Sequence, residues 1–574
     1  MPRPAKLKRS RTLEICQYKV PGEDGYVCPH DVLNINNPSY CVFHLHKITE
    51  KEWASRDEAE VVELLSINDK FRDGIKDLIK KAGKQKPKFM DFRGFHFPLI
   101  KFDPITFPCE IDCSHAIFNE DVDFSVKTKN GWGPLLLSGA IFKNTKFCGN
   151  VNFSGCSVYG RMSFNNATFF KDANFSQAYF EQSPTFHEAE MHGAVDFNDA
   201  VFLNVGFLKT KFLGKVEFGQ TRLWGTASFL EAEFHKPVDF FLVEFSSEPE
   251  TEEIKERTGY YPGSTIFARA IFFDTVIFRS VFEKTVYFDK ATFQKGAHFD
   301  STNISKLFTE DAFLMDLKIP SGQDLIFQKV NLELARFHGT NLETVVFNDV
   351  SWGRPKSITE RMFRGASYVL RDETLPYRNA WEFYEWGSEP RVNKYNAQTA
   401  ENYRQLVLNS EAKRDYEAAE YFHVGEMEMR RRLMGIDRRW REYFNGYTLY
   451  LLSSRYGTSY IQAVLILVLI LSYFSFLFLF TGLKPTNENH TATARIIEYN
   501  LFSDSNHIQA SIVDIFSDLV ESIFFTVDVA TFQKEKKYEP LDWLSRLLLY
   551  PALVLPTGQT ALILLAIRRR FRRE

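Results

Sequence analysis

Four residues near the N-terminus have the types and spacing of a metal site. Cys16, Cys28, Cys41 and His44 supply three thiols and one imidazole in under thirty residues. The Cys-x2-His pair places two donors on one tight turn, as a tetrahedral zinc ion requires. The stretch is rich in turn-forming residues and poor in apolar ones, so a bound metal would be what folds it. The sequence predicts a structural zinc ion (Zn) here, because four protein ligands leave no open position for water.

Two alternatives remain at this site. His30 and His46 lie close enough in sequence to replace His44 as the fourth ligand, and the cysteines could also be reduced thiols in a loose segment. The seven cysteines are odd in number and none follows Cys156, which is not the pattern of a disulfide framework. No apolar segment follows the basic N-terminus, so we expect no secretory signal and a reducing, cytosolic location for this part.

Phenylalanine is the most unusual feature of the composition, with 56 residues among 574. From Phe142 onward it recurs at alternating gaps of five and six residues, a period of eleven, and Val158 and Met191 occupy two positions where it is missing. An α-helix would move each successive ring about 140° around its axis, and a strand repeats its faces every two residues, so neither keeps these rings together. A four-sided solenoid does, because each side contributes one large residue to the interior.

Small residues stand two positions before many of these rings, as in Ala167-Thr-Phe169 and Ala291-Thr-Phe293. This repeat pattern resembles that of the pentapeptide-repeat family, which is A-(D/N)-(L/F)-x-x. The resemblance covers residues 89–350 and implies a right-handed quadrilateral β-helix, here with about 22 residues per coil because alternate repeats are one residue longer. The repeat pattern is interrupted at Lys127–Leu136 and at Ser246–Ser264. The second segment is acidic and is expected to loop out.

We expect this rod to be a spacer or a docking surface for an unknown protein partner. Some pentapeptide-repeat proteins mimic DNA and protect DNA gyrase, but this requires a strongly acidic rod. Here lysines alternate with acids, and the whole chain has a net charge of −3, so no nucleic-acid partner is predicted. The lysines are Lys143, Lys146, Lys171, Lys209, Lys211 and Lys215.

The remaining sequence divides around the rod. Residues 1–50 form the Cys/His leader, 51–88 a helical linker, 351–445 a helical adaptor with a basic juxtamembrane segment, and 446–574 a membrane domain. Within the adaptor, residues 396–434 have the 3–4 spacing of apolar residues that is typical of a helical hairpin, and they resemble one tetratricopeptide-type helix pair. The basic residues that follow are interleaved with aromatic ones, which suits an anionic membrane face. They are Arg430, Arg431, Arg432, Arg438, Arg439 and Arg441, with Trp440, Tyr443 and Phe444.

Two uncharged segments, Tyr456–Leu483 and Leu547–Ile567, are each long enough to cross the ~30 Å hydrocarbon core of a membrane. Arginines precede the first segment and follow the second, so the positive-inside rule predicts a multi-pass protein with two spans and cytoplasmic N- and C-termini. Ser511–Phe525, between them, has an amphipathic helical pattern and is too short and too acidic to span.

The order span, short helix, span resembles the two-transmembrane pore module of potassium-type channels. The resemblance implies that the intervening helix is re-entrant and that Thr526, Asp528 and Thr531 line a pore; a helix resting on the membrane surface is the alternative. No glycine occurs between Gly482 and Gly558, so a potassium filter built of carbonyls is not expected, whereas a ring of acids favours cations. Two spans cannot enclose a pore alone, so conduction implies a homo-oligomer, with a tetramer as the expected form.

The sequence holds no recognisable catalytic set, so we do not expect an enzyme. Two hypotheses remain for the function. The protein is an oligomeric cation channel with a cytosolic repeat rod as sensor or docking region, or it is a membrane-tethered scaffold that does not conduct.

Overall fold

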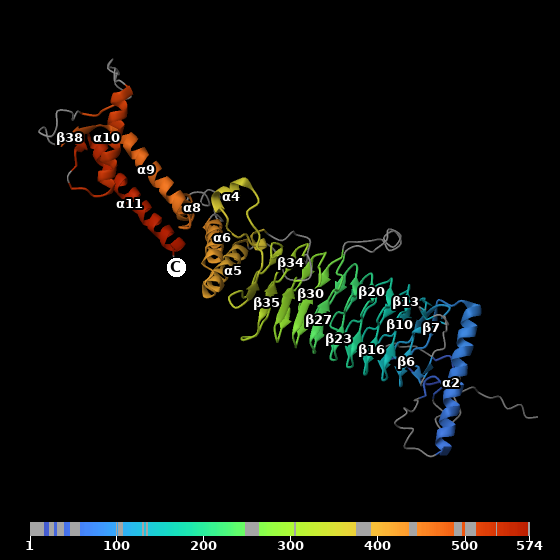
Figure 1. Ribbon diagram of the computed structural model, residues 1–574. Coiled ribbons are helices and arrows are strands. Elements are labelled where there is room, and N and C mark those ends of the chain that lie inside the picture. The colour runs from blue at the N-terminus through green and yellow to red at the C-terminus, as the bar shows by residue number, and fades with distance from the viewer. Residues whose placement is uncertain are drawn as a thin grey trace, which may run out of the picture. The chain divides into compact units, whose positions relative to one another are not determined.

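The computed structural model forms two compact units, Met1–Gly353 with Leu370–Asp372, and Arg354–Val369 with Glu373–Glu574 (Figure 1). The structure describes residues 16–21, 28–30, 40–45, 58–98, 100–101, 107–128, 131–133, 136–246, 263–302, 306–374, 392–434, 445–486, 496–499, 512–534 and 536–571.

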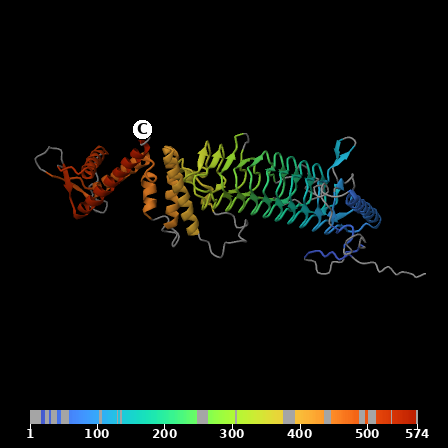
Figure 2. The ribbon, with the colours of Figure 1, turned by 90° about the horizontal axis from the view of Figure 1, so that it is seen from below.

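The first unit is a β-solenoid of about ten turns, in which short parallel strands stack from coil to coil (Figure 2). Four strands, one per side, make up a full coil. Lys146 pairs with Thr168, and Thr168 pairs with Glu190, so equivalent positions are 22 residues apart in these coils. The four sides and the coil length agree with the prediction from the phenylalanine period.

Each side of the solenoid is one ladder of strands. The first side contains β1 (Phe89–Asp91), β4 (Glu110–Asp112), β10 (Ala140–Ile141), β14 (Met162–Ser163), β21 (Val205–Gly206), β25 (Ala227–Ser228), β28 (Thr265–Ile266), β31 (Val286–Tyr287), β34 (Ala312–Phe313) and β36 (Ala335–Arg336). The second contains β2 (His96–Phe97), β5 (Ile117–Phe118), β11 (Lys146–Phe147), β15 (Thr168–Phe169), β18 (Glu190–Met191), β22 (Lys211–Phe212), β26 (Glu233–Phe234), β29 (Ile271–Phe272) and β32 (Thr292–Phe293). The third contains β3 (Ile100–Lys101), β6 (Val122–Asp123), β12 (Val151–Asn152), β16 (Ala173–Asn174), β19 (Val195–Asp196), β23 (Val216–Glu217), β27 (Val238–Phe241), β30 (Val276–Arg279), β33 (Ala297–Asp300), β35 (Leu325–Gln328) and β37 (Val346–Asn348). The fourth contains β9 (Leu136–Leu137), β13 (Ser157–Val158), β17 (Tyr179–Phe180), β20 (Val201–Phe202) and β24 (Arg222–Leu223).

Columns of stacked phenyl rings fill the interior. Phe153, Phe175 and Phe197 stack face to face with centroid separations of 5.3 and 5.2 Å, one ring per coil. Each coil therefore buries its rings against the coils above and below, which is the packing predicted for a solenoid. The rings predicted to point inward are all buried: Phe142, Phe147, Phe153, Phe164, Phe169, Phe175, Phe180, Phe186, Phe197, Phe202, Phe212, Phe218, Phe229, Phe234, Phe240, Phe245, Phe267, Phe272, Phe278, Phe288, Phe293 and Phe299, with Val158, Met191 and Leu223 in the missing places.

The alternation of five and six residues has its origin in the corners. Asn166, Gln177, Glu188 and Asp199 have φ between 56° and 59°, and they recur every eleven residues. Each lies two positions after the ring that opens a five-residue side. A left-handed residue closes that corner tightly, whereas the other sides take one residue more.

The first interruption of the repeat pattern leaves the solenoid. The segment predicted from Lys127 to Leu136 forms an antiparallel hairpin of β7 (Val126–Thr128) and β8 (Gly131–Gly133), after which β9 rejoins the ladder. Most of the acidic interruption, residues 247–262, lies outside the described residues.

A helix and part of the leader cover the first coil of the solenoid. Helix α2 (Glu58–Gln85) packs Phe71 edge-on against Phe97, at 5.4 Å between centroids. Phe43 of the leader accepts a backbone hydrogen bond from His96 and lies so close to α2 that a Cβ at Gly74 would come within 2.7 Å of its ring. These contacts cover the strand edge that the first coil would otherwise expose to solvent.

The second unit is helical, and it contains the predicted hairpin and both apolar helices. Asp415 caps the second hairpin helix by accepting a hydrogen bond from the backbone N–H of Ala418 at 3.0 Å. The apolar helices α9 and α11 are long enough to cross a membrane. The elements are α4 (Ile358–Arg364), η1 (Arg371–Glu373, shared with the first unit), α5 (Val392–Ala412), α6 (Tyr416–Met434), α8 (Gly446–Ser454), α9 (Tyr460–Thr481), α10 (Ile512–Ala530) and α11 (Trp543–Phe571), with β38 (Leu483–Pro485) pairing β39 (Tyr538–Pro540).

Candidate functional site

Cys16, Cys28, Cys41 and His44 form one buried Cys3His cluster, with all four ligand atoms within 4.8 Å of one another. The sulfurs of Cys28 and Cys41 are 3.8 Å apart, and Nδ1 of His44 lies 3.5 Å from the sulfur of Cys16 and 3.2 Å from that of Cys41. Tetrahedral zinc, with bonds of about 2.3 Å to sulfur and 2.0 Å to nitrogen, separates two sulfurs by about 3.8 Å and a sulfur from a nitrogen by about 3.5 Å. The cluster therefore fits a metal such as zinc.

The first coil of the solenoid orients the imidazole of His44. Its Nε2 donates a hydrogen bond to the carbonyl oxygen of Arg93 at 3.0 Å, and Tyr18 stacks on its ring at 4.0 Å between centroids. With the proton on Nε2, the lone pair of Nδ1 faces the three sulfurs, which is the usual arrangement of a metal-bound histidine. The hydrogen bond from the Cys28 thiol lowers the pKa of the Cys41 thiol and favours the thiolate that a metal binds.

The structure distinguishes among the alternative ligands that it describes. His30 packs against the rings of Phe43 and Phe95, at 4.6 and 5.9 Å, and it is not part of the cluster. His46 lies outside the described residues. His44, predicted from the Cys-x2-His spacing, is therefore the fourth member of the cluster.

Helix α10 packs between the two long apolar helices. Phe525 and Val529 of α10 share a buried cluster with Phe474 and Phe478 of α9 and Ala552 of α11. These α9 residues lie in its C-terminal third and Ala552 in the N-terminal third of α11, so α10 contacts the corresponding ends of both helices. Phe525 is buried in this cluster, whereas the neighbouring Phe524 is exposed.

The predicted pore-lining residues have different surroundings. α10 continues to Ala530, five residues beyond the predicted end at Phe525, because Thr526–Ala530 continue its helical hydrogen bonding. Thr526 is buried and accepts a hydrogen bond from Ser475 of α9 at 3.0 Å. Asp528 is half-buried in the last turn, and Thr531 is exposed after the helix.

A buried network of charges joins the adaptor to the segment before α9. Glu373 accepts two hydrogen bonds from Arg364, both at 2.7 Å, and one from Arg432 at 3.1 Å. Glu428 pairs with Arg431 at 2.7 Å and accepts a hydrogen bond from Tyr456 at 3.2 Å. Sequence reasoning missed this network.

The network also changes the interpretation of the first juxtamembrane arginines. Arg430 pairs with Glu426, and Arg431 and Arg432 pair with Glu428, so these three guanidiniums are engaged within the unit. The i,i+3 and i,i+4 spacing of these pairs was the available signal. Arg438, Arg439 and Arg441 lie outside the described residues.

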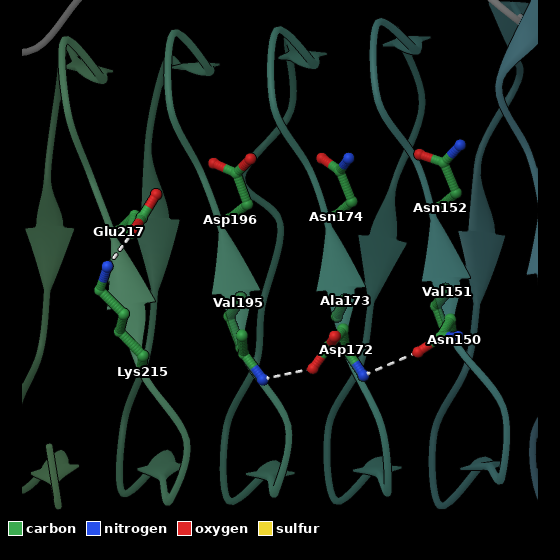
Figure 3. Close-up of a pocket in the computed structure, with 11 residues that line it drawn as sticks. Asn150, Val151, Asn152, Asp172, Ala173, Asn174, Val195, Asp196, Lys215 and Glu217 are labelled. Atoms are coloured by element: carbon green, nitrogen blue, oxygen red, sulfur yellow. Dashed lines mark hydrogen bonds and ion pairs between the residues drawn. The ribbon is translucent and has the colours of Figure 1, made fainter.

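The third side of the solenoid carries an open groove of about 360 Å³ (Figure 3). Asn152, Asn174 and Asp196 recur one per coil along it. A neighbouring column supports the coils themselves, because Asp172 accepts a hydrogen bond from the backbone of Ala194 at 2.8 Å. The full lining is Asn150, Val151, Asn152, Asp172, Ala173, Asn174, Ala194, Val195, Asp196, Lys215 and Glu217.

The comparisons agree with the repeat architecture. The family model for pentapeptide repeats (9 copies) matches residues 142–190, which lie within the solenoid. No curated protein and no solved structure matches the chain. Part of the four-sided solenoid thus matches the pentapeptide-repeat family, and the solenoid is followed by two helices long and apolar enough to span a membrane.

Proposed function

We propose that this protein is an oligomeric cation channel of the two-transmembrane type, anchored in a membrane by α9 and α11, with the solenoid as a cytosolic docking or sensor region. Both termini lie in the cytoplasm, since arginines flank the apolar helices on that side. The oligomer is a tetramer, and the solenoid binds a protein partner rather than a nucleic acid.

The observation that supports conduction best is the position of α10. Ser522 of α10 donates a hydrogen bond to the carbonyl oxygen of Ser475 at 2.6 Å, and Thr526 accepts one from the Ser475 hydroxyl. Ser475 lies well inside the apolar span of α9, so a helix bonded to it enters the membrane instead of resting on its surface. Polar contacts of this kind hold helices together in lipid.

Ion selection in this arrangement depends on side chains. The carbonyl oxygens at the end of α10 do not form a filter, because they accept hydrogen bonds from the residues that follow the helix, as Val527 does from Thr531 and Asp528 from Gln533. Asp528 lies in the last turn of α10, and Thr531 follows the helix directly. Thr526 is bonded to α9, so Asp528 and Thr531 are the residues that remain to line the pore. One Asp528 per subunit forms a ring that attracts cations and repels anions.

The continuous helix also favours a second candidate, a membrane-tethered scaffold without conduction. Cation flux into liposomes and single-channel recording in planar bilayers separate the two. The channel proposal expects currents from an oligomer. The absence of current in every preparation, together with a monomer or dimer in detergent, would contradict the channel and support the scaffold.

The Cys3His cluster binds one structural zinc ion in this proposal. Its support is the match of the measured separations to the edges of a zinc tetrahedron. Cys16, Cys28, Cys41 and His44 hold the ion, which fixes the leader against the first coil of the solenoid. Metal analysis of the purified protein tests this assignment.

A further inference from the structure

Helix α4 exposes an apolar face that the described part of its unit leaves uncovered. Ile358 is 85% and Met362 70% exposed, and Phe363 beside them is also exposed. Ile358 and Met362 are four residues apart and share one face of the helix. Arg364, by contrast, is buried in its ion pair with Glu373. One side of α4 is therefore fixed by charge pairing while the apolar side faces outward.

The helix is well formed in spite of its length. Ser357 caps it by accepting a hydrogen bond from the N–H of Glu360, and the Glu360 carboxylate accepts one from the N–H of Ser357 in return. Such a capping box satisfies two backbone donors at once. Gly365 ends the helix. These ends indicate a helix of defined length, with its apolar face in a fixed direction.

Contacts of Arg455 hold α4 next to the start of the first span. Arg455 is the residue that ends α8, and its Nη2 donates a hydrogen bond to the carbonyl oxygen of Met362 at 3.3 Å. The same guanidinium lies against Gly365, where a Cβ would collide with it. Tyr460, the first residue of α9, is five residues further along the chain. In the proposed topology, α4 thus lies where the chain enters the membrane.

Exposed apolar residues continue along the chain from α8 into the span. Leu449 and Leu452 of α8 are exposed, as are Ile461 and Leu465 in the first turns of α9. Lipid surrounds α9 in the proposed function. The exposed apolar residues just before α9 in the chain therefore lie near the same lipid. This continuity favours a lipid surface over a soluble partner.

The charges around α4 complement an anionic lipid surface. Lys356 and Arg361 flank its apolar face and are exposed, and Arg455 lies at its end. Arg568 near the end of α11 is also exposed. Glu360 is the acid of α4, and its carboxylate is used in the capping box. Apolar residues flanked by basic ones are typical of helices that lie in the headgroup layer.

We propose that α4 is a second membrane contact, a helix that lies in the cytoplasmic headgroup layer with Ile358, Met362 and Phe363 against the acyl chains of anionic lipid. The proposal rests on the proposed anchoring of α9 in a membrane. It adds a contact that holds the adaptor against the bilayer, beside the entry of the first span.

Photo-crosslinking tests this contact in the full-length protein. Benzoylphenylalanine replaces one exposed phenylalanine at a time, so the change in shape is small at each position. Phe363 of α4 is 43% exposed, Phe476 in the C-terminal third of α9 54%, and Phe170 on the solenoid 48%. Each variant is reconstituted into vesicles of phosphatidylcholine and phosphatidylglycerol and irradiated, and its adducts are identified by mass spectrometry.

We expect about tenfold more lipid adduct at position 363 than at position 170, since a helix in the headgroup layer is in constant contact with lipid. Lipid adducts at 476 but not at 363 overturn the proposal for α4 and leave the anchoring in place. Adducts of 363 to protein, from a second copy or another chain, overturn it as well. A lack of lipid adducts at both 476 and 363 contradicts the membrane anchoring itself.

Discussion

The hydroxyl of Tyr456 donates a hydrogen bond to Glu428 over 3.2 Å, and both residues are buried. Glu428 belongs to the second helix of the adaptor hairpin, and Tyr456 lies four residues before α9. The pair therefore joins the adaptor to the segment that precedes the first apolar helix. Any movement of the hairpin that reaches the membrane helices in the proposed channel has this contact on its path.

Glu428 should make the stability of the hairpin depend on pH. Burial alone would raise its pKa, but the hydrogen bond from Arg431 and the nearby guanidiniums outweigh burial and lower the pKa to about 2. A lowered pKa gives stability that is complete above the unfolded value of 4.5 and is lost as the pH falls to about 2. We expect Glu428→Gln to remove roughly 3 kcal/mol near neutral pH.

Hydrogen exchange of the α6 amides measures this effect, with wild type and variant compared at each pH. The difference between them should shrink between pH 4.5 and 2. Glu401→Gln is the matched control, because Glu401 pairs with Arg404 on an exposed face at 3.7 Å and such pairs contribute little. A difference of equal size for both variants would contradict the role of Glu428.

The Cys3His cluster should bind about one zinc ion per chain, as four protein ligands form one tetrahedral site. Elemental analysis of the purified protein should show zinc in wild type and none in Cys41→Ser. Cys148→Ser should keep the metal, because Cys148 is a free thiol outside the cluster. His30→Ala should keep it too. Protein with a folded leader and no metal would end the zinc assignment.

The phenylalanine columns should dominate the stability of the solenoid. Phe175 is fully buried between Phe153 and Phe197, so Phe175→Ala should cost ~3–5 kcal/mol in the free energy of unfolding. Phe170, a few residues away, is exposed, and Phe170→Ala should change it by about 0.5 kcal/mol or less. Chemical unfolding followed by circular dichroism measures both. Equal effects would show that the interior columns do not carry the stability.

Asp528→Asn should lower cation flux or cation preference in liposomes, because it removes the charge of the proposed acid ring. Asp514→Asn, near the other end of α10, is the control and should leave the flux close to wild type. Unchanged selectivity and conductance in Asp528→Asn would remove this residue from the pore.

Much of the fold could be predicted because its signals are local and repeated. The eleven-residue period of phenylalanine specified the four-sided coil, and the structure confirms both the interior rings and the 22-residue spacing. The hairpin and the two apolar helices followed from periodicity and from uncharged length. Helix α10 was predicted too short, because the resemblance to a pore module placed pore-lining residues from Thr526 onward, whereas the structure continues the helix to Ala530.

The metal cluster could be predicted from the sequence only in part. The sequence by itself determined that Cys16, Cys28 and Cys41 were candidate ligands, because thiols at this spacing have few other uses. It predicted His44 as the fourth ligand and left His30 and His46 as alternatives. The tertiary structure decided for His44, since the carbonyl of Arg93 in the first coil orients its ring and the rings of Phe43 and Phe95 take His30 away from the sulfurs.

The pairing of Glu373 with Arg364 and Arg432, and of Glu428 with Tyr456, was likewise decided by the tertiary structure alone. The contacts of a repeat recur at a fixed spacing in the sequence, and an apolar helix is recognised by the length of its uncharged segment. The sequence by itself therefore determined the solenoid and the two long helices. Glu373 and Arg432 are 59 positions apart and Glu428 and Tyr456 are 28 positions apart, so no local pattern states that these residues meet. Only the packing of α4, α5, α6 and the segment before α9 brings those charges together.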